Sequence, residues 1–192
     1  MQLNDLFDAN FNEHAEVLAA TREALMAPYV NLTDICVESI RQGGKIMFFG
    51  NGGSASDSQH LATELTIRYI ADRDPIAAIA LTTDTSAITA GGNDIGFDNI
   101  FARQIAALGK AGDVAIGIST SGNSENVIRG LRTAKEMEIT AAGFGGKGGG
   151  KMNGLASPYL VVPSDTTPRI QEMHILVGHL LCDGVERKLG LV

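Results

Sequence analysis

The first forty residues carry hydrophobic side chains at the spacing of amphipathic helices. The residues that follow this spacing are Leu3, Leu6, Phe7, Phe11, Ala15, Leu18 and Leu25. Pro28 interrupts the pattern, and a proline inside a helix removes one backbone hydrogen bond. We therefore expect a pair of helices in residues 1–42. The second helix of the pair runs from about Asn31 to Gln42 and ends at the glycines 43–44, a common helix-end signal.

From residue 45 onward, short apolar runs alternate with segments of helical periodicity. The apolar runs predict strands at residues 45–49, 76–81, 114–118, 139–144 and 159–162. The segments between and after them predict helices at residues 54–69, 85–90, 99–108, 124–137 and 168–189. Strands that alternate with helices join by right-handed crossovers into a parallel sheet covered on both faces. The pattern thus predicts an α/β fold, a three-layer sandwich around a five-stranded parallel sheet.

The length of the chain suits one domain. It has 192 residues, 44% of them hydrophobic, which is enough for one compact core. No internal repeat or linker-like stretch divides it. We therefore expect residues 1–192 to form a single domain, with the N-terminal helices outside the alternating α/β pattern.

The charge balance argues against several classes of partner. The net charge is −7 at pH 7, and the isoelectric point is about 5.0. Non-specific nucleic-acid binding and docking on an anionic membrane both need basic patches. No stretch approaches the ~20 apolar residues that span a bilayer, and the acidic N-terminus does not resemble a signal peptide. We expect a cytoplasmic protein that binds neither nucleic acid nor membrane.

The chain has two cysteines, Cys36 and Cys182. Two cysteines cannot form a zinc site of the cysteine-cluster type. In a reducing compartment such residues are typically buried free thiols, and we expect this here.

Three polar clusters come after predicted strands, one of them after the helix that follows its strand. Parallel sheets bind ligands at the carboxyl ends of their strands. The clusters are Asn51-Gly52-Gly53-Ser54, Asn93-Asp94 in a predicted loop at residues 91–94, and Ser119–Ser124. The last cluster carries four hydroxyls, on Ser119, Thr120, Ser121 and Ser124, at a predicted helix start. Free backbone N–H groups and the helix dipole favour an anion there. Two interpretations fit: a cradle for one phosphate monoester, or a helix start with more capping residues than it needs.

A nucleotide cofactor is not expected. No lysine follows the hydroxyl cluster as in a Walker motif, and no GxGxxG follows any predicted strand. A second glycine-rich stretch, residues 143–154, follows the fourth predicted strand directly. It fits either a mobile lid or a plain turn.

His60 and Glu64 are four residues apart in a predicted helix, so they share one face. Such a pair can bind a metal or share proton transfer, although an ordinary amphipathic helix also explains it. The terminal helix adds Gln171, Glu172 and His179. Spacing leaves open whether Glu172 or Gln171 is the partner of His179. His174, on the same helix, is of a type that is usually structural when it stands alone.

Four segments together resemble the sugar isomerase (SIS) domain family. They are GNGGSASDSQHLATEL, GGNDIGF, ISTSGNSENV and RIQEMHILVGHLLCD. The resemblance covers nearly the whole chain. Within the family the pattern is similar to that of the isomerases of sedoheptulose 7-phosphate.

The resemblance implies a fold, an assembly and a reaction. The fold is the five-stranded SIS sandwich, and the assembly is a homotetramer with active sites between subunits. The N-terminal helices would bury their apolar stripe in this assembly. The reaction converts sedoheptulose 7-phosphate into D-glycero-D-manno-heptose 7-phosphate through an enediol, at the entry to bacterial heptose synthesis for lipopolysaccharide. An aldose–ketose exchange needs an acid and a base and no redox cofactor.

The resemblance also implies roles for individual residues. The phosphate would be held by Ser119, Thr120, Ser121 and Ser124. The sugar would contact Asn51, Gly52, Gly53, Glu64, Asn93, Asp94 and Gln171. One zinc ion per subunit would be bound by His60, Glu64, Gln171 and His179. The catalytic base would be Glu64 and the acid His179.

One position departs from the family pattern. Some members carry an acidic residue directly before the Arg-Ile-Gln run, where this chain has Pro168. Other SIS proteins are non-catalytic phosphosugar-binding regulators or partners of the replication initiator, and others isomerise different sugar phosphates. The regulators tend to lack a glutamate and a histidine at the positions of Glu64 and His179, and this chain keeps both.

Overall fold

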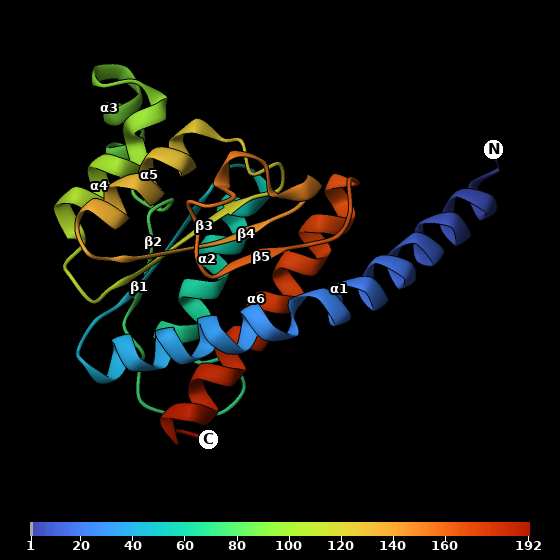
Figure 1. Cartoon of the computed structure of the whole chain (residues 1–192), viewed down its shortest axis with the longest axis horizontal. Helices are drawn as coiled ribbons and strands as arrows, with labels where there is room; N and C mark the ends of the chain where they lie inside the picture. The colour runs from blue at the N-terminus through green and yellow to red at the C-terminus, as the bar shows by residue number, and fades with distance from the viewer. Residues whose placement is uncertain (1) are drawn as a thin grey trace.

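The computed structural model describes residues 2–192, which form the predicted α/β sandwich (Figure 1). The elements are α1 (Leu3–Arg41), β1 (Ile46–Gly50), α2 (Gly53–Thr66), β2 (Ala78–Ala80), α3 (Thr85–Asp94), η1 (Phe97–Asn99), α4 (Ile100–Leu108), β3 (Val114–Ser119), α5 (Glu125–Glu136), β4 (Thr140–Gly145), η2 (Lys147–Met152), β5 (Tyr159–Val161) and α6 (Thr167–Leu189). The strands form one parallel sheet of five in the order β2-β1-β3-β4-β5. The predicted fold class is confirmed.

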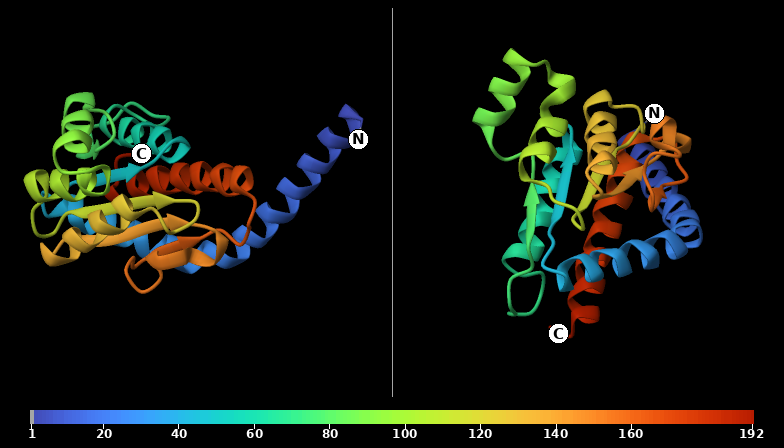
Figure 2. Two further views of the ribbon diagram at one scale, coloured as in Figure 1. Left: turned by 90° about the horizontal axis from the view of Figure 1, so that it is seen from above. Right: turned by 60° about the vertical axis from the view of Figure 1, so that its left-hand side comes forward.

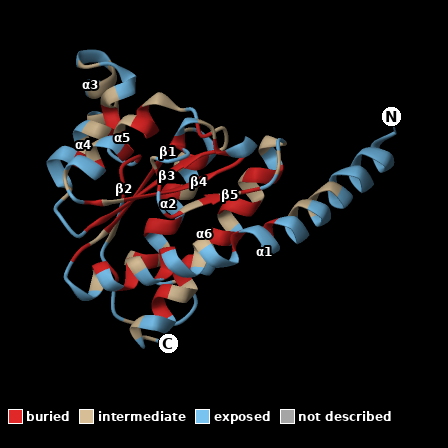
Figure 3. Cartoon of the chain, viewed as in Figure 1, coloured by how far each residue is buried: buried red, intermediate tan, exposed pale blue. Residues whose placement is uncertain are grey.

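The sheet has a separate hydrophobic core on each face. Successive side chains of a strand point to opposite faces, and β1 shows the result. Ile46 and Phe48 join the core under α1, α2 and α6, whereas Met47 and Phe49 join the core under α4 and α5. All four side chains are fully buried. The buried residues in Figure 3 accordingly run along the sheet and the inner sides of the helices.

The prediction of two N-terminal helices is wrong, because residues 3–41 form one continuous helix with Pro28 inside it. A proline inside a helix removes one backbone hydrogen bond and its ring clashes with the carbonyl four residues earlier, but tertiary packing can offset this cost. The second half of α1 supplies this packing, since Leu25, Leu32 and Cys36 are buried. Figure 2 shows that the axis of α1 changes direction between its halves and that the N-terminal half projects from the body.

A second difference concerns residues 91–94, which were expected to form a loop. They are the last turn of α3, whose start is capped by Asp84 accepting a hydrogen bond from the Ala87 N–H at 3.0 Å. The two glycines, Gly91 and Gly92, lower helix propensity and produced the loop prediction. Gly91 faces the Ile100 side chain, which a Cβ would meet at 3.3 Å, so its small size suits the packing of α3 on α4.

Strand order places two of the predicted polar clusters side by side. β1 connects onward to β2 on one side, while β3 pairs with β1 on the other, with Gly50 beside Ile118. This reversal of direction is the point where open parallel sheets bind ligands. The segments that follow β1 and β3 therefore lie next to each other at the carboxyl edge of the sheet.

Two further expectations can be compared with the structure. Cys36 and Cys182 are both free and buried, as expected. Within residues 2–192, no helix combines the length and apolar character that a membrane-spanning segment needs.

Candidate active site

The hydroxyl cluster forms a compact turn between β3 and α5, which we call the anion loop (residues 119–124). Ser119 ends β3, and its Oγ lies 3.1 Å from the Oγ of Ser124. Ser124 is the N-cap residue of α5, yet its side chain makes no capping hydrogen bond among the described residues. This geometry favours a ligand role for the Ser124 hydroxyl over simple capping. The twelve-residue helix α5 directs its N-terminus at this loop, which favours an anion.

The segment after β1 is joined to the anion loop by a pair of amides. Asn51 Nδ2 donates to Asn126 Oδ1, and Asn126 Nδ2 donates to Asn51 Oδ1, both at 2.9 Å. Asn126 is buried in the first turn of α5. Its part in the site had no signal in the sequence beyond its place three residues after Asn123. Asn51 thus fixes the two loops relative to each other.

His60, Glu64 and His179 come together between α2 and α6. His60 Nε2 lies 2.8 Å from His179 Nε2 and 3.2 Å from Glu64 Oε1. Because two imidazole nitrogens at this distance share one proton, one ring accepts where the other donates. Partial burial lowers the pKa of His179, as does the neighbouring His60, while Glu64 acts in the opposite sense. His179 is therefore held toward its neutral form, which is the form that binds metals.

The triad suits a zinc ion in both chemistry and spacing. One ligand atom from each side chain lies within 4.8 Å of the others. Two imidazole nitrogens and a carboxylate oxygen are common zinc ligands. Ligands of a tetrahedral zinc at ~2.05 Å are about 3.3 Å apart, so only small movements separate the observed arrangement from coordination. A metal would replace the proton that the two rings share.

Gln171, the fourth expected ligand, is not with the triad. A Cβ built on Gly53 would lie 2.4 Å from Gln171 Nε2, so the Gln171 amide rests against the first residue of α2. His179 is eight residues further along α6, about 12 Å by helical rise. The Gln171 amide thus lies against Gly53, and His60 follows seven residues further along α2.

Glu172 is excluded as the partner of His179. It accepts hydrogen bonds from Arg169 Nη2 at 2.8 Å and pairs with His14 Nδ1 at 2.7 Å. These contacts tie α6 to the N-terminal half of α1. His174 is buried, with Nε2 3.0 Å from the Gly145 carbonyl, and burial lowers its pKa to about 4. It is a neutral structural residue, as expected.

Sequence reasoning missed two neighbours of the triad. Asp57 shares the helical face of His60 and Glu64, at the i−3 and i−7 positions, and this spacing was a usable signal. Partial burial raises the pKa of Asp57 to about 6, opposed by His60. The Tyr69 ring lies beside that of His179, with centroids 5.5 Å apart. Only the fold brings this tyrosine back to the triad.

Gly53, Asp57, His60 and Glu64 of α2, together with Gln171 and His179 of α6, form what we call the polar seam. It begins beside the anion loop, because Ser54 packs closely on Gly50. A Cβ at Gly50 would lie 2.8 Å from the Ser54 Cβ and 2.7 Å from the Ile118 carbonyl oxygen. The seam continues along α2 to the triad. A turn suited to binding an anion and a cluster suited to proton transfer or metal binding are thus joined along α2.

Asn93 and Asp94 are the only expected substrate contacts that lie apart. Both are exposed at the end of α3, where Asn93 Nδ2 donates to Asp94 Oδ1 at 2.7 Å. α3 packs on η1 and α4 and stands out from the body in Figure 1. Within the described part of this chain, neither side chain forms a hydrogen bond with the anion loop or the polar seam.

Comparisons with known proteins identify the family. A model of the SIS domain matches residues 10–146. The phosphoheptose isomerase of Paramagnetospirillum magneticum is 58% identical over 186 residues, covering 97% of both chains. The chain belongs to the phosphoheptose isomerase family of SIS domain proteins. The family extends to Aquifex aeolicus, whose phosphoheptose isomerase is 52% identical over 176 residues and 92% of both chains.

Solved structures of the same family share the fold over nearly the whole length. The phosphoheptose isomerase of Francisella tularensis matches with a TM-score of 0.94 and 35% identity, covering 97% of this chain and 100% of that one. The enzyme of Neisseria gonorrhoeae matches with a TM-score of 0.89 and 42% identity, with the same coverage. The expected enzyme class, phosphosugar isomerase, is confirmed.

Proposed function

We propose that this protein interconverts D-sedoheptulose 7-phosphate and D-glycero-D-manno-heptose 7-phosphate. The observation that carries the proposal is the polar seam, which joins an anion loop to an intact His–Glu–His triad. Relatives named phosphoheptose isomerase support the substrate class. We further propose that the reaction is the first step of bacterial ADP-heptose synthesis for the lipopolysaccharide core and takes place in the cytoplasm. Two free buried cysteines suit that reducing compartment.

The length of the seam suits a seven-carbon substrate. Gly53 and His60 are seven residues apart on α2, about 10 Å by helical rise. An extended seven-carbon chain with a terminal phosphate is also about 10 Å long, because each of its eight bonds of roughly 1.5 Å advances the zigzag chain by about 1.25 Å. A phosphate in the anion loop would therefore leave C1 and C2 near the triad.

The residues of the anion loop, the polar seam and their neighbours then take distinct roles. Ser119, Thr120, Ser121 and Ser124 bind the phosphate with hydroxyl and backbone donors. Asn51, Gly52, Gly53, Asn93, Asp94 and Gln171 contact the sugar. Glu64 removes the proton from C1 of the ketose and returns it to C2. His179 gives a proton to the C2 oxygen and takes one back from the C1 hydroxyl, so no net proton is gained or lost. Asn93 and Asp94 would need another chain or a movement of α3 to reach the substrate.

One zinc ion per subunit fits the triad as described above. His60, Glu64 and His179 would hold it, and Gln171 would join only from another chain or after rearrangement. The ion would polarise the sugar carbonyl as a Lewis acid. His179 and Glu64 would still need a free nitrogen or oxygen to serve in proton transfer.

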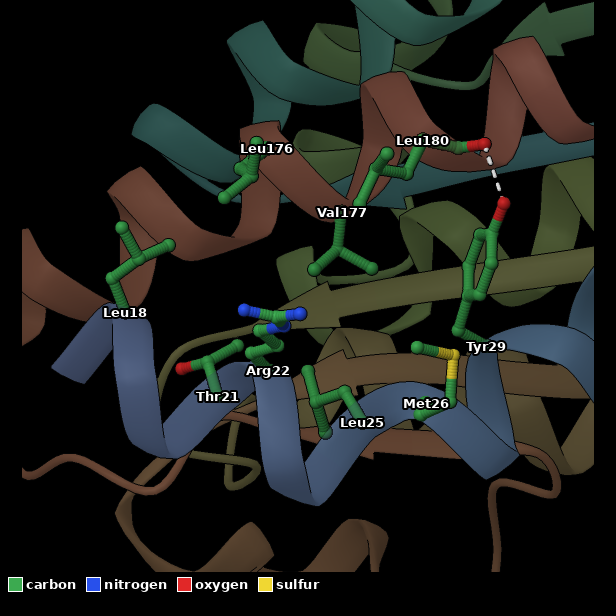
Figure 4. Close-up of a pocket in the computed structure, with 9 residues that line it drawn as sticks. All are labelled: Leu18, Thr21, Arg22, Leu25, Met26, Tyr29, Leu176, Val177 and Leu180. Atoms are coloured by element: carbon green, nitrogen blue, oxygen red, sulfur yellow. Dashed lines mark hydrogen bonds between the residues drawn. The ribbon is translucent and has the colours of Figure 1, made fainter.

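We also propose a homotetramer in which α1 contacts other subunits. The projecting half of α1 exposes Leu3, Phe7 and Phe11 by 81%, 62% and 63% of their surface. Beside it, an apolar groove of about 380 Å³ separates α1 from α6 (Figure 4). It is lined by Leu18, Thr21, Arg22, Leu25, Met26, Tyr29, Leu176, Val177 and Leu180. Isolated helical segments are marginal in water, so this half needs a partner surface.

Light scattering on the purified protein checks the assembly. We expect four times the 20.2 kDa chain mass. Replacing Phe7 and Phe11 with glutamate should yield smaller species, because charged side chains would enter an apolar interface. A stable monomer of the wild type at micromolar concentration would contradict the tetramer.

An assay on sedoheptulose 7-phosphate tests the function itself. The wild-type protein, stripped of metal and then loaded with zinc, should produce the aldose phosphate. Proton NMR would monitor the formation of this product. Zinc should restore whatever activity the chelator removes. The proposal fails if the zinc-loaded protein binds the ketose phosphate without converting it, which is the behaviour of a regulator.

A further inference from the structure

The glycine-rich segment after β4 is packed directly onto the anion loop. We call residues 146–154 the glycine brace. Met152 N–H donates to the Gly122 carbonyl at 3.0 Å, and Lys151 N–H donates to Asn123 Oδ1 at 3.1 Å. Met152 is fully buried, and Lys147 N–H bonds the Ser164 carbonyl at 2.9 Å. These hydrogen bonds join the segment, expected to be either a mobile lid or a plain turn, to the anion loop and to Ser164.

The hydroxyl of Tyr159, at the start of β5, forms a hydrogen bond with the glycine brace. It donates to the Gly149 carbonyl at 2.8 Å. The Tyr159 hydroxyl lies close to the backbone of two glycines. A Cβ at Gly145 would be 2.1 Å from the hydroxyl oxygen, and a Cβ at Gly122 would be 2.8 Å from it. Burial raises the pKa of Tyr159 to about 12, so it stays a donor at neutral pH.

Close backbone contact between brace and loop explains the glycines. A Cβ at Gly122 would lie 1.9 Å from the Gly149 carbonyl oxygen, and a Cβ at Gly150 would lie 2.4 Å from the Ser121 carbonyl oxygen. Both residues also have positive φ, +64° and +54°. The two segments therefore touch backbone to backbone at the point where the loop turns.

Asn123 completes the connection from the side of the loop. Its Nδ2 donates to the Ser121 carbonyl at 2.9 Å, while its Oδ1 accepts from the brace. Its own N–H donates to Ser121 Oγ at 3.2 Å. One side chain thus sets the direction of the Ser121 peptide and anchors it to residues 146–154.

We propose that Tyr159 and Asn123 are positioning residues, which act through the glycine brace to hold the anion loop in its phosphate-binding shape. The inference rests on the proposed function in assigning the phosphate of the substrate to this loop. Neither side chain needs to touch the phosphate. Holding the donors of the loop in place before binding avoids an ordering cost, so the brace contributes affinity and not chemistry.

The Tyr159→Phe variant tests this inference, because it removes the hydroxyl and keeps the ring. We expect KM for sedoheptulose 7-phosphate to rise roughly three- to tenfold, the range of one neutral hydrogen bond. The dissociation constant of inorganic phosphate, measured by calorimetry, should rise by the same factor. The value of kcat should stay within about twofold. Asn123→Ala should shift the same constants in the same direction.

Tyr29→Phe is the matched control. Tyr29 also donates from its hydroxyl to a backbone carbonyl, that of Leu180 at 3.0 Å, but in the groove between α1 and α6. It should leave KM and phosphate affinity unchanged. The proposal is overturned if Tyr159→Phe binds phosphate as the wild type does, if Tyr29→Phe shows the same shift, or if kcat falls as far as KM rises. Phosphate calorimetry reports on the brace even if the wild type does not isomerise the sugar, so failure of the proposed function is seen separately.

Discussion

Replacing Glu64 with glutamine should lower kcat by about 10²–10⁴-fold, the usual contribution of a general acid or base. This corresponds to roughly 2.7–5.4 kcal/mol of transition-state stabilisation. Glutamine keeps the shape of the side chain between α2 and α6 but cannot accept a proton from carbon. The measurement is kcat on sedoheptulose 7-phosphate, together with deuterium uptake at the substrate carbon in heavy water.

Glu64 also belongs to the triad that we propose binds zinc, so the zinc content of each variant must be measured. His60→Gln removes a ligand and leaves the carboxylate, and it separates the two roles. Glu38→Gln, on the exposed side of α1, is the control for loss of a carboxyl outside the site. A zinc-loaded Glu64→Gln protein that still exchanges the substrate proton at the wild-type rate would show that Glu64 is not the base.

The double replacement Ser121→Ala with Ser124→Ala should raise KM for the phosphosugar by at least about 10²-fold. Two hydrogen bonds to a charged phosphate contribute roughly 1.5 kcal/mol or more each. Thermal stability should change little, because Ser124 makes no capping hydrogen bond to α5 and the hydrogen bond that Ser121 Oγ accepts from the Asn123 N–H lies in an exposed turn. KM and the melting temperature, measured on the same preparation, distinguish loss of binding from loss of fold.

Thr85→Ala with Ser86→Ala provides a matched control. It removes two hydroxyls from the start of α3, a helix outside the proposed phosphate site. This variant should keep the wild-type KM. Unchanged phosphosugar affinity in the Ser121/Ser124 double variant would instead return the anion loop to the status of an ordinary helix start.

The sequence alone determined the fold class and most elements, because burial imposes a period on every strand and helix. β3 and β4 lie buried at the center of the sheet, so their apolar runs were continuous and their predicted bounds held within one residue. Prediction was wrong where one residue type dominated the local signal. Pro28 suggested a break in α1, and Gly91-Gly92 suggested a loop in α3. In α1, packing of its second half offset the local preference.

The sequence predicted only part of the candidate site, because local geometry does not determine how the helices pack. His60 and Glu64 are one turn apart on α2, so their proximity followed from helical geometry. The partner of His179 could not be predicted from helical geometry, because it depends on how α2 packs against α6. Tertiary structure placed His179 on the triad, directed Glu172 to His14 and Arg169, and moved Gln171 to the start of α2.

The support around the anion loop was decided by tertiary structure alone. The four hydroxyls are adjacent in sequence, and their place at a helix start was predictable. The glycine brace bonds Gly122 and Asn123 of that loop, and Tyr159 in turn bonds the brace. Asn126, just after the loop, bonds Asn51, which is 75 residues away in the sequence. A sequence records which side chains can donate or accept a hydrogen bond. Only the packing of α5, β5 and residues 146–154 determines which partners they meet.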